Sequence, residues 1–146
     1  MSRIINHQVI SYLKTKPRNI IIIHHGKFED IEYLDIGLEF SKLLLPILNT
    51  KHISFKAQDL LQELLISFIS NNSVLGEILP LTNCGILFEN ELQIDILALI
   101  DKYSKGTILI LDWQGEVENN KLYFLDKSYG LTIDMSHMSH LFYKGV

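Results

Sequence analysis

The feature that most constrains this chain is a run of four isoleucines at residues 20–23, bounded by polar residues on both sides. A short run that is apolar at every position, rather than at every second one, is typical of a strand covered on both faces. A second such run spans residues 107–111 and ends in Asp112 and Trp113. Two buried strands of this kind predict a parallel sheet with other elements packed on each side.

The most regular amphipathic pattern follows Ser54, which we expect to cap a helix at its amino end. Apolar residues recur there at the i, i+3, i+4 and i+7 spacing of one helix face. A helix with this pattern must cover a sheet, so Leu61 and Leu65 are expected to be buried together with Ile21 and Ile23. The apolar face consists of Ala57, Leu60, Leu61, Leu64, Leu65 and Phe68.

Helical spacing recurs in three other places. One helix is expected to begin with Ser2 as its N-cap and to end before Pro17. Two more are expected over residues 38–45 and 91–103. Residues 78–88 are apolar, but the proline and the glycine within them allow only part of this segment to be a regular strand.

These elements predict a three-layer α/β fold with a mostly parallel sheet, formed as a single domain over residues 1–146. Residues 28–35 fit either a short strand or the start of the next helix. Residues 118–121 are typical of a hairpin turn, and the hairpin is expected to add an antiparallel edge to the sheet. The tail, residues 131–146, is expected to form a short strand or coil and a final helix.

Composition excludes several classes of protein. The chain has 146 residues, of which 47% are hydrophobic, and a net charge of -4. An apolar fraction this high is unlike a disordered protein, and the negative charge argues against direct nucleic-acid binding. Residues 1–16 lack the continuous apolar region of a signal peptide, so none is expected, and no apolar run approaches the roughly 18 residues that span a membrane. Cys84 is the only cysteine, which excludes an intrachain disulfide. We therefore expect a soluble cytoplasmic protein.

Leucine and isoleucine are more abundant than one small core easily hides. Part of this apolar surface is expected to form a contiguous exposed patch, and such patches usually mark interfaces. The expected places are residues 43–47, where a proline disturbs helix packing, and Phe142 with Tyr143 near the C-terminus. This predicts a homodimer or a complex with another protein.

A candidate phosphate site follows the first buried strand, at His24-His25-Gly26-Lys27. A P-loop needs G-x-x-x-x-G-K-[ST], because its backbone N–H groups wrap the phosphates and its glycines permit the turn. This chain has one glycine, Gly26, a lysine beside it, Lys27, and no hydroxyl residue for magnesium. Asp112 stands after the second strand, where such folds hold magnesium. Gly26, Lys27 and Asp112 are thus candidates for ATP and magnesium, and ordinary turn residues are the alternative interpretation.

Two histidines near the C-terminus, His137 and His140, are candidate metal ligands. Residues three apart share one face of a helix, so a helix here would bring both imidazoles to one ion. The alternative interpretation is two solvated side chains near a chain end. Cys84 lies in an apolar segment without a nucleophile motif and is predicted to be inert.

The order of several short segments resembles the BrxF family, small P-loop-type proteins of bacteriophage exclusion (BREX) defence systems. The matching segments are Leu38-Glu39-Phe40-Ser41, Ile86-Leu87-Phe88-Glu89, Tyr103-Ser104, Trp113-Gln114-Gly115 and Lys121-Leu122-Tyr123. The resemblance implies a P-loop NTPase-like core and a place among the proteins of an antiviral defence system.

The chain departs from the family at both nucleotide motifs. The resemblance implies a Walker A loop after the first strand, but only His24-His25-Gly26-Lys27 stands there. Only about six residues separate the first strand from Ile31, which are too few for a crossover helix. The resemblance also implies an acid shortly before the Ile86-Leu87-Phe88 segment, where this chain has Thr82-Asn83-Cys84. The fold is therefore expected without the complete nucleotide machinery.

Three hypotheses follow. The first is a non-catalytic interaction subunit of an anti-phage defence assembly, which binds other defence proteins or a second copy and needs no cofactor. The second is a nucleotide-binding protein or weak ATPase that uses Gly26 and Lys27 against phosphate and Asp112 on magnesium. The third is a small metal-binding regulator that uses His137 and His140.

Overall fold

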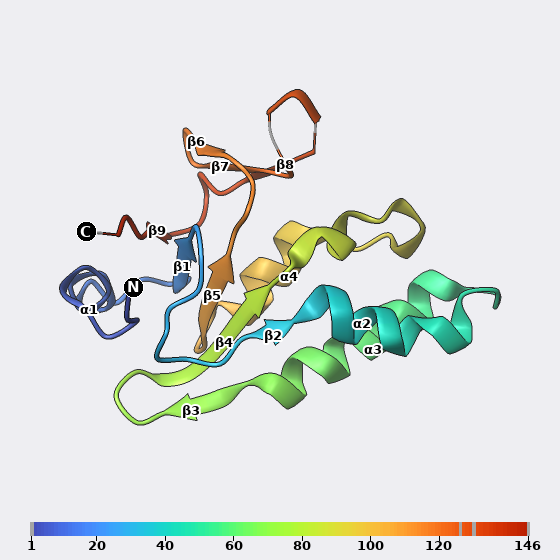
Figure 1. Ribbon diagram of the computed structural model, residues 1–146, viewed down its shortest axis with the longest axis horizontal. Helices are drawn as coiled ribbons and strands as arrows, with labels where there is room; N and C mark the ends of the chain where they lie inside the picture. The colour runs from blue at the N-terminus through green and yellow to red at the C-terminus, as the bar shows by residue number, and fades with distance from the viewer. Residues whose placement is uncertain (1, 126, 130, 146) are drawn as a thin grey trace.

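The computed structural model describes residues 2–125, 127–129 and 131–145. Figure 1 shows how the helices and strands are arranged. In chain order the elements are α1 (His7–Lys14), β1 (Ile21–His24), β2 (Leu34–Asp35), α2 (Ile36–Leu44), η1 (Leu45–Ile47), α3 (Ile53–Phe68), β3 (Ser70–Asn72), β4 (Gly76–Thr82), η2 (Cys84–Phe88), η3 (Asn90–Leu92), α4 (Ile96–Tyr103), β5 (Ile108–Asp112), β6 (Val117–Glu118), β7 (Lys121–Tyr123), η4 (Lys127–Tyr129), β8 (Thr132–Asp134) and β9 (Leu141–Phe142).

The main sheet has the strand order β2-β4-β5-β1-β9, and all five strands are parallel. The short strand β3 pairs antiparallel with the first residues of β4. The α/β fold with a mostly parallel sheet, predicted from the two apolar runs, is confirmed. Pro80 lies within β4, between the residues that pair with β3 and those that pair with β2, where that edge has no partner strand.

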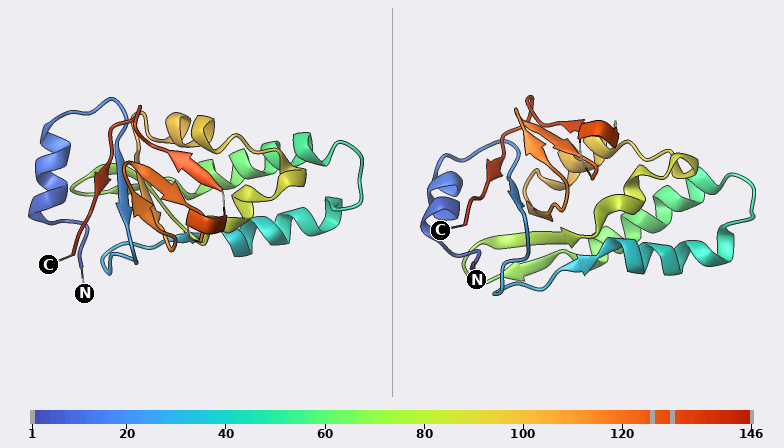
Figure 2. Two further views of the ribbon diagram at one scale, coloured as in Figure 1. Left: turned by 90° about the horizontal axis from the view of Figure 1, so that it is seen from above. Right: turned by 45° about the horizontal axis from the view of Figure 1, so that its top comes forward.

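Both faces of β1 and β5 are buried, as the unbroken apolar runs require. Ile21 and Ile23 belong to a core shared with Leu61 and Leu65 of α3, as predicted. Ile22 points to the opposite face and packs in a second cluster with residues of α1 and the loop after β1. Figure 2 shows α1 on one side of β1 and β5, and α2, α3 and α4 on the other. The alternation of a strand's side chains thus divides one isoleucine run between two cores.

Several helices begin at residues other than those expected. Asn6, not Ser2, caps α1 by accepting the backbone N–H of Val9, because the chain before it is tied to the loop near Glu29. The N-cap residue of α3 is His52, which has a left-handed backbone conformation. Ser54 lies inside the helix and does not cap it. The helix expected over residues 91–103 begins only at Ile96, where the Asp95 carboxylate caps it.

The segment of residues 28–35, for which a strand and a helix both remained open, is mostly irregular and ends in the two-residue strand β2. Asp35, the last residue of β2, caps α2 by accepting the N–H of Leu38. Figure 1 shows α2 and α3 side by side, extending away from the sheet. No helix among the described residues is long and apolar enough to cross a membrane.

The hairpin forms, but it does not add an antiparallel edge to the main sheet. Asn119 and Asn120 both have positive φ, as a two-residue turn of this kind requires. Strands β6, β7 and β8 form a separate antiparallel sheet, whose Leu122 and Ile133 join the main core. The edge beside β1 is taken by β9, which runs parallel. The prediction of a final helix is also wrong, since the described residues of the tail form β8, β9 and turns.

Candidate functional site

The carboxyl ends of β4, β5 and β1 meet at one end of the sheet. β1 lies between β5 and β9, and the chain leaves it for β2 at the far edge before returning through β4 and β5. A ligand crevice in an open parallel sheet forms where the strand order reverses in this way, at the carboxyl ends of the strands. His24 pairs with Asp112 in the register of β1 and β5. This is the place where a functional site is expected.

Asp112 is the centre of a hydrogen-bonded cluster at this end of the sheet. Its side chain is buried and accepts the backbone N–H of Gly26 at 2.9 Å and the hydroxyl of Thr82 at 2.7 Å. The side-chain amide of Gln114 donates to the same carboxylate. A buried carboxylate is costly unless hydrogen bonds satisfy it, and three donors from three segments do so here. We call these four residues the Asp112 cluster.

Gly26 is needed in the Asp112 cluster because of its backbone conformation. Its φ is +135°, a value that residues with a Cβ rarely adopt. A steric clash does not explain the glycine, because the nearest atom to a Cβ at this position is a ring carbon of His24 at 3.8 Å. The glycine thus turns its N–H towards Asp112 directly after β1 ends.

The rest of the loop after β1 does not gather its N–H groups around one point. The N–H of Phe28 donates to the hydroxyl of Tyr33 at 3.0 Å. The N–H of Glu29 donates to the carbonyl of Ser2 at 2.9 Å. No helix follows directly, since residues 25–33 are irregular. A P-loop instead points successive N–H groups at one anion and continues into a helix.

Lys27 lies in the same loop and is exposed. No hydrogen bond or ion pair joins it to Asp112 within the described residues. Its charge acts on Asp35, whose pKa lies below the ordinary value mainly because the N–H of Leu38 and the amide of Asn83 donate to the carboxylate. Lys27 makes a smaller contribution to that shift. Of the three expected nucleotide-site residues, the fold brings Gly26 and Asp112 into contact and leaves Lys27 in solvent.

Thr82 and Asn83 stand where the family resemblance places an acid. Thr82 ends β4 and bonds to Asp112, whereas Asn83 adopts a left-handed φ of 57° and donates its amide to Asp35 at 2.9 Å. Gly37 allows this approach, because a Cβ there would lie 2.3 Å from the Asn83 amide nitrogen. Both residues link neighbouring strands by hydrogen bonds to a carboxylate. Their position before the Ile86-Leu87-Phe88 segment marked where the resemblance implies an acid, but nothing in the two residues themselves indicated hydrogen bonds to Asp112 and Asp35.

The two histidines at the end of β1 have different environments. His24 stacks on Phe28 with ring centroids 4.6 Å apart and meets Tyr143 edge-on at 4.9 Å. Burial lowers the pKa of its imidazole, against the opposing charge of Asp112. Its buried Nδ1 has no hydrogen-bond partner among the described residues. His25 instead places Nδ1 2.7 Å from the carbonyl of Trp113. Both rings therefore serve packing or strand-end contacts.

The two C-terminal histidines do not share a helix face, because the segment between β8 and β9 is not helical. His137 is exposed, and Nδ1 of His140 lies 2.8 Å from the carbonyl of Met138. Among residues 2–125, 127–129 and 131–145, no group of three or more His, Cys, Asp or Glu side chains is placed to hold a metal. Cys84 is buried, and burial raises the pKa of its thiol to about 12.

A larger concave surface lies away from the Asp112 cluster. An open groove of about 1010 Å³ runs between α2–η1 on one side and η2–η3 on the other. Three leucines on its first wall are half or more exposed: Leu38 at 50%, Leu45 at 67% and Leu48 at 51%. We call this surface the leucine groove. Within the patch expected at residues 43–47, Leu45 is exposed in this groove, but Leu44 is buried and Ile47 is partly buried against the core. The prediction of a patch at Phe142 and Tyr143 is wrong, because Tyr143 is buried.

Comparisons of the chain with family models, with curated proteins and with solved structures find no match. The function must therefore be inferred from the geometry of the molecule itself. The Asp112 carboxylate is satisfied by hydrogen bonds of the chain itself, and a cavity of about 220 Å³ beside it is lined by residues that include Asp112 and Gln114. The leucine groove is open and largely apolar.

Proposed function

We propose that this protein is a non-catalytic, P-loop-like interaction subunit of an anti-phage defence assembly in the cytoplasm. The observation that carries the proposal is the Asp112 cluster. The N–H of Gly26, which a P-loop would offer to phosphate, donates to an internal carboxylate. That carboxylate also adds a negative charge where a phosphate would have to sit, and like charges at this distance repel.

The path of the chain supports the same proposal. β1 lies inside the sheet, as the phosphate-binding strand of a P-loop-type core would, and β5 ends beside it in an acid. The connection from β1 to β2 has no helix, so the loop lacks the helix N-terminus that stabilises phosphate. A P-loop-like core that has lost these parts agrees with the resemblance to the BrxF family and with its missing motifs.

The leucine groove supports a role in interaction. Leu38, Leu45 and Leu48 expose apolar area in one concavity, as interface patches do. Its opposite wall carries Glu89 and Glu91, both exposed. The occupant that fits is an amphipathic segment of another defence protein, with an apolar face towards the leucines and Lys or Arg beside the two glutamates.

The experiment is co-expression of the chain with each protein encoded beside it, followed by co-purification. The wild type is expected to retain one neighbour, and Leu45→Asp is expected to lose it because a carboxylate would enter the apolar face of the interface. Val74→Asp is the matched control, since Val74 is 61% exposed, close to the value for Leu45, and lies on the β3–β4 turn outside the groove. Retention of the neighbour by Leu45→Asp would contradict the groove. A monomer that retains no neighbour would contradict the proposed role.

The alternative function is nucleotide binding with weak ATPase activity. It is favoured by the position of Gly26 and the exposed Lys27 at the switch point of the sheet. Under the proposed function, calorimetry with Mg-ATP should give a dissociation constant weaker than about 1 mM. Micromolar binding that Lys27→Ala abolishes would establish the alternative and remove the non-catalytic assignment.

A further inference from the structure

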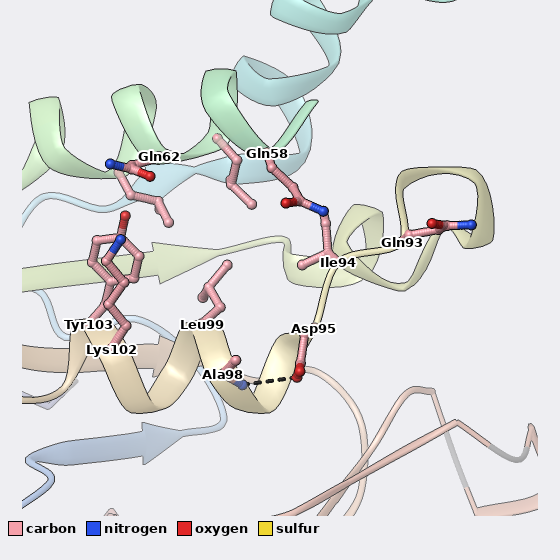
Figure 3. Close-up of a pocket in the computed structure, with 11 residues that line it drawn as sticks. Gln58, Gln62, Gln93, Ile94, Asp95, Ala98, Leu99, Lys102 and Tyr103 are labelled. Carbon is pink, nitrogen blue, oxygen red and sulfur yellow. Dashed lines mark hydrogen bonds between the residues drawn. The ribbon is translucent and has the colours of Figure 1, made fainter. Parts of the chain in front are cut away.

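A smaller cleft of about 240 Å³ lies between α3 and α4 (Figure 3). It is separate from the Asp112 cluster, with which it shares no residue. Leu61 and Leu65 of α3 and Leu99 of α4 supply apolar lining. The side-chain amides of Gln58 and Gln62 border the same space. The cleft therefore combines an apolar interior with polar groups at its edge, as small-molecule sites do.

Tyr103, at the end of α4, brings an unsatisfied polar group to this cleft. Its side chain is only 8% exposed, and its hydroxyl extends from α4 towards α3 in Figure 3. No described residue forms a hydrogen bond with that hydroxyl. A buried polar atom without a partner costs free energy, so its presence calls for an explanation, and a ligand is one. Burial also raises the pKa of Tyr103, which keeps the hydroxyl protonated and able to donate.

The charges at the cleft favour an anion. The carboxylate of Asp95 is already used, because it caps α4 by accepting the N–H of Ala98 at 3.0 Å. The ammonium group of Lys102 lies 5.4 Å from the centre of the Tyr103 ring and forms no ion pair among the described residues. Asp95 and Lys102 stand at opposite ends of α4, so the charge at the Tyr103 end of the cleft is positive. Lys102 and Gln62 are exposed, so either side chain can rotate to admit a ligand to the hydroxyl.

We propose that the cleft between α3 and α4 binds a small organic carboxylate with an apolar body. The Tyr103 hydroxyl donates a hydrogen bond to the carboxylate, Lys102 neutralises its charge, and the leucines contact the apolar chain. The volume is below the range of sites for drug-sized molecules, so the ligand is expected to have only about ten heavy atoms. This inference does not depend on the proposed function, because it uses neither the Asp112 cluster nor the leucine groove.

The test is an NMR titration of the full chain with hexanoate, with hexan-1-ol and hexylamine as neutral and cationic probes of the same length. Hexanoate is expected to cause saturable shifts in α3 and α4, with a dissociation constant on the order of 1–10 mM for so small a ligand. The two other probes should bind at least about fivefold more weakly, since they lack the charge that Lys102 neutralises.

Two variants separate a ligand site from a structural tyrosine. Tyr103→Phe should weaken hexanoate binding by roughly tenfold, while the melting temperature of the free protein stays the same or rises because an unsatisfied hydroxyl is removed. Lys102→Met should weaken binding similarly. Lys105→Met is the matched control, because Lys105 lies just beyond the same helix and pairs with Asp101 at 2.9 Å, away from the cleft.

Three results would overturn the proposal. The first is the absence of saturable shifts in α3 and α4 up to about 20 mM hexanoate. The second is equal binding of hexylamine and hexanoate. The third is unchanged hexanoate binding by Lys102→Met, a variant of an exposed side chain that is expected to fold even if Tyr103→Phe does not.

Discussion

The carboxyl end of the sheet and the helical side of the molecule differ in whether buried polar groups have hydrogen-bond partners and whether apolar side chains are covered. At the sheet end, the Asp112 carboxylate is buried and satisfied by the chain's own donors, Gly26, Thr82 and Gln114, although Nδ1 of the neighbouring His24 has no partner among the described residues. On the helical side, the Tyr103 hydroxyl is buried without a partner in the described part of the chain, and Leu45 is exposed in a groove. A site that satisfies itself has used the groups that a ligand would need. Unsatisfied groups and exposed leucines mark where something else can bind.

The difference also separates two kinds of stabilisation. The Asp112 cluster joins β1, β4 and β5 through hydrogen bonds to one charge, and each is worth more than a neutral hydrogen bond. The helices α2 and α3 pack by apolar contacts on their inner faces, while their outer faces keep exposed leucine and isoleucine. We therefore expect substitutions on the two faces of α3 to change the free energy of unfolding by different amounts. The same holds for substitutions inside and outside the Asp112 cluster.

The largest effect is expected for Leu65→Ala on the inner face of α3. Leu65 is fully buried in the core with Ile21 and Ile23, and truncation of such a residue costs about 2–5 kcal/mol of unfolding free energy. Urea denaturation measures it. Ile66→Ala, one residue further and 52% exposed, should change stability by less than about 1 kcal/mol. Equal effects of the two variants would mean that α3 does not use its inner face as described.

The next effect is expected for Asp112→Ala, at the sheet end. This variant leaves the Gly26 N–H and the Thr82 hydroxyl without their acceptor in a buried place, which should cost about 2–4 kcal/mol. Asp59→Ala, at an exposed position on α3, is the control and should be nearly neutral. A loss below about 1 kcal/mol in urea denaturation would show that the carboxylate is not structural and would reopen the site for magnesium.

A smaller, pH-dependent effect is expected from His24 beside the Asp112 cluster. Its folded pKa is lowered, chiefly by burial, so the neutral imidazole is favoured in the fold. Its contribution is complete above the unfolded value of about 6.5 and decreases as the pH falls through that value towards the folded one. The urea midpoint should therefore drop between pH 7.5 and 5.5, and His24→Phe should reduce the drop. His137→Phe, at an exposed position, should not; an identical drop in both variants would contradict the assignment.

The smallest effect on stability is expected in the leucine groove. Leu45→Gln replaces a side chain that is 67% exposed, so the unfolding free energy of the isolated protein should change by no more than about 0.5 kcal/mol. A thermal melt of the purified variant measures this. A loss of more than about 2 kcal/mol would mean that Leu45 stabilises the free chain, and the groove would then not be a surface kept open for a partner.

Local patterns in the sequence predicted much of the fold. The apolar runs predicted β1 and β5, the helical spacing predicted the buried face of α3, and Asn119-Asn120 predicted the hairpin turn. These succeed because strand burial, helix periodicity and turn conformation depend on neighbouring residues. The N-caps were predicted less well, since nearby Ser, Asn and Asp residues compete and the surrounding packing selects among them.

The candidate site was predicted only in part. Gly26 and Asp112 were singled out, but as ligands of a nucleotide rather than as partners of each other. Thr82 and Gln114 were not assigned to the site, because nothing in a Thr-Asn or Trp-Gln pair indicates a shared carboxylate. The cleft under Tyr103 left no local signal at all, since it arises where α3 and α4 face each other.

The sequence by itself determined the two buried strands β1 and β5, the hairpin turn and the apolar face of α3. Only the tertiary structure decided the order β2-β4-β5-β1-β9, the two-residue strands β2 and β9, and the separate sheet of β6, β7 and β8. The order placed Gly26 next to Asp112, 86 residues away in the chain. Periodicity acts within one turn or one strand, whereas contacts between strand ends depend on how the whole chain closes its core.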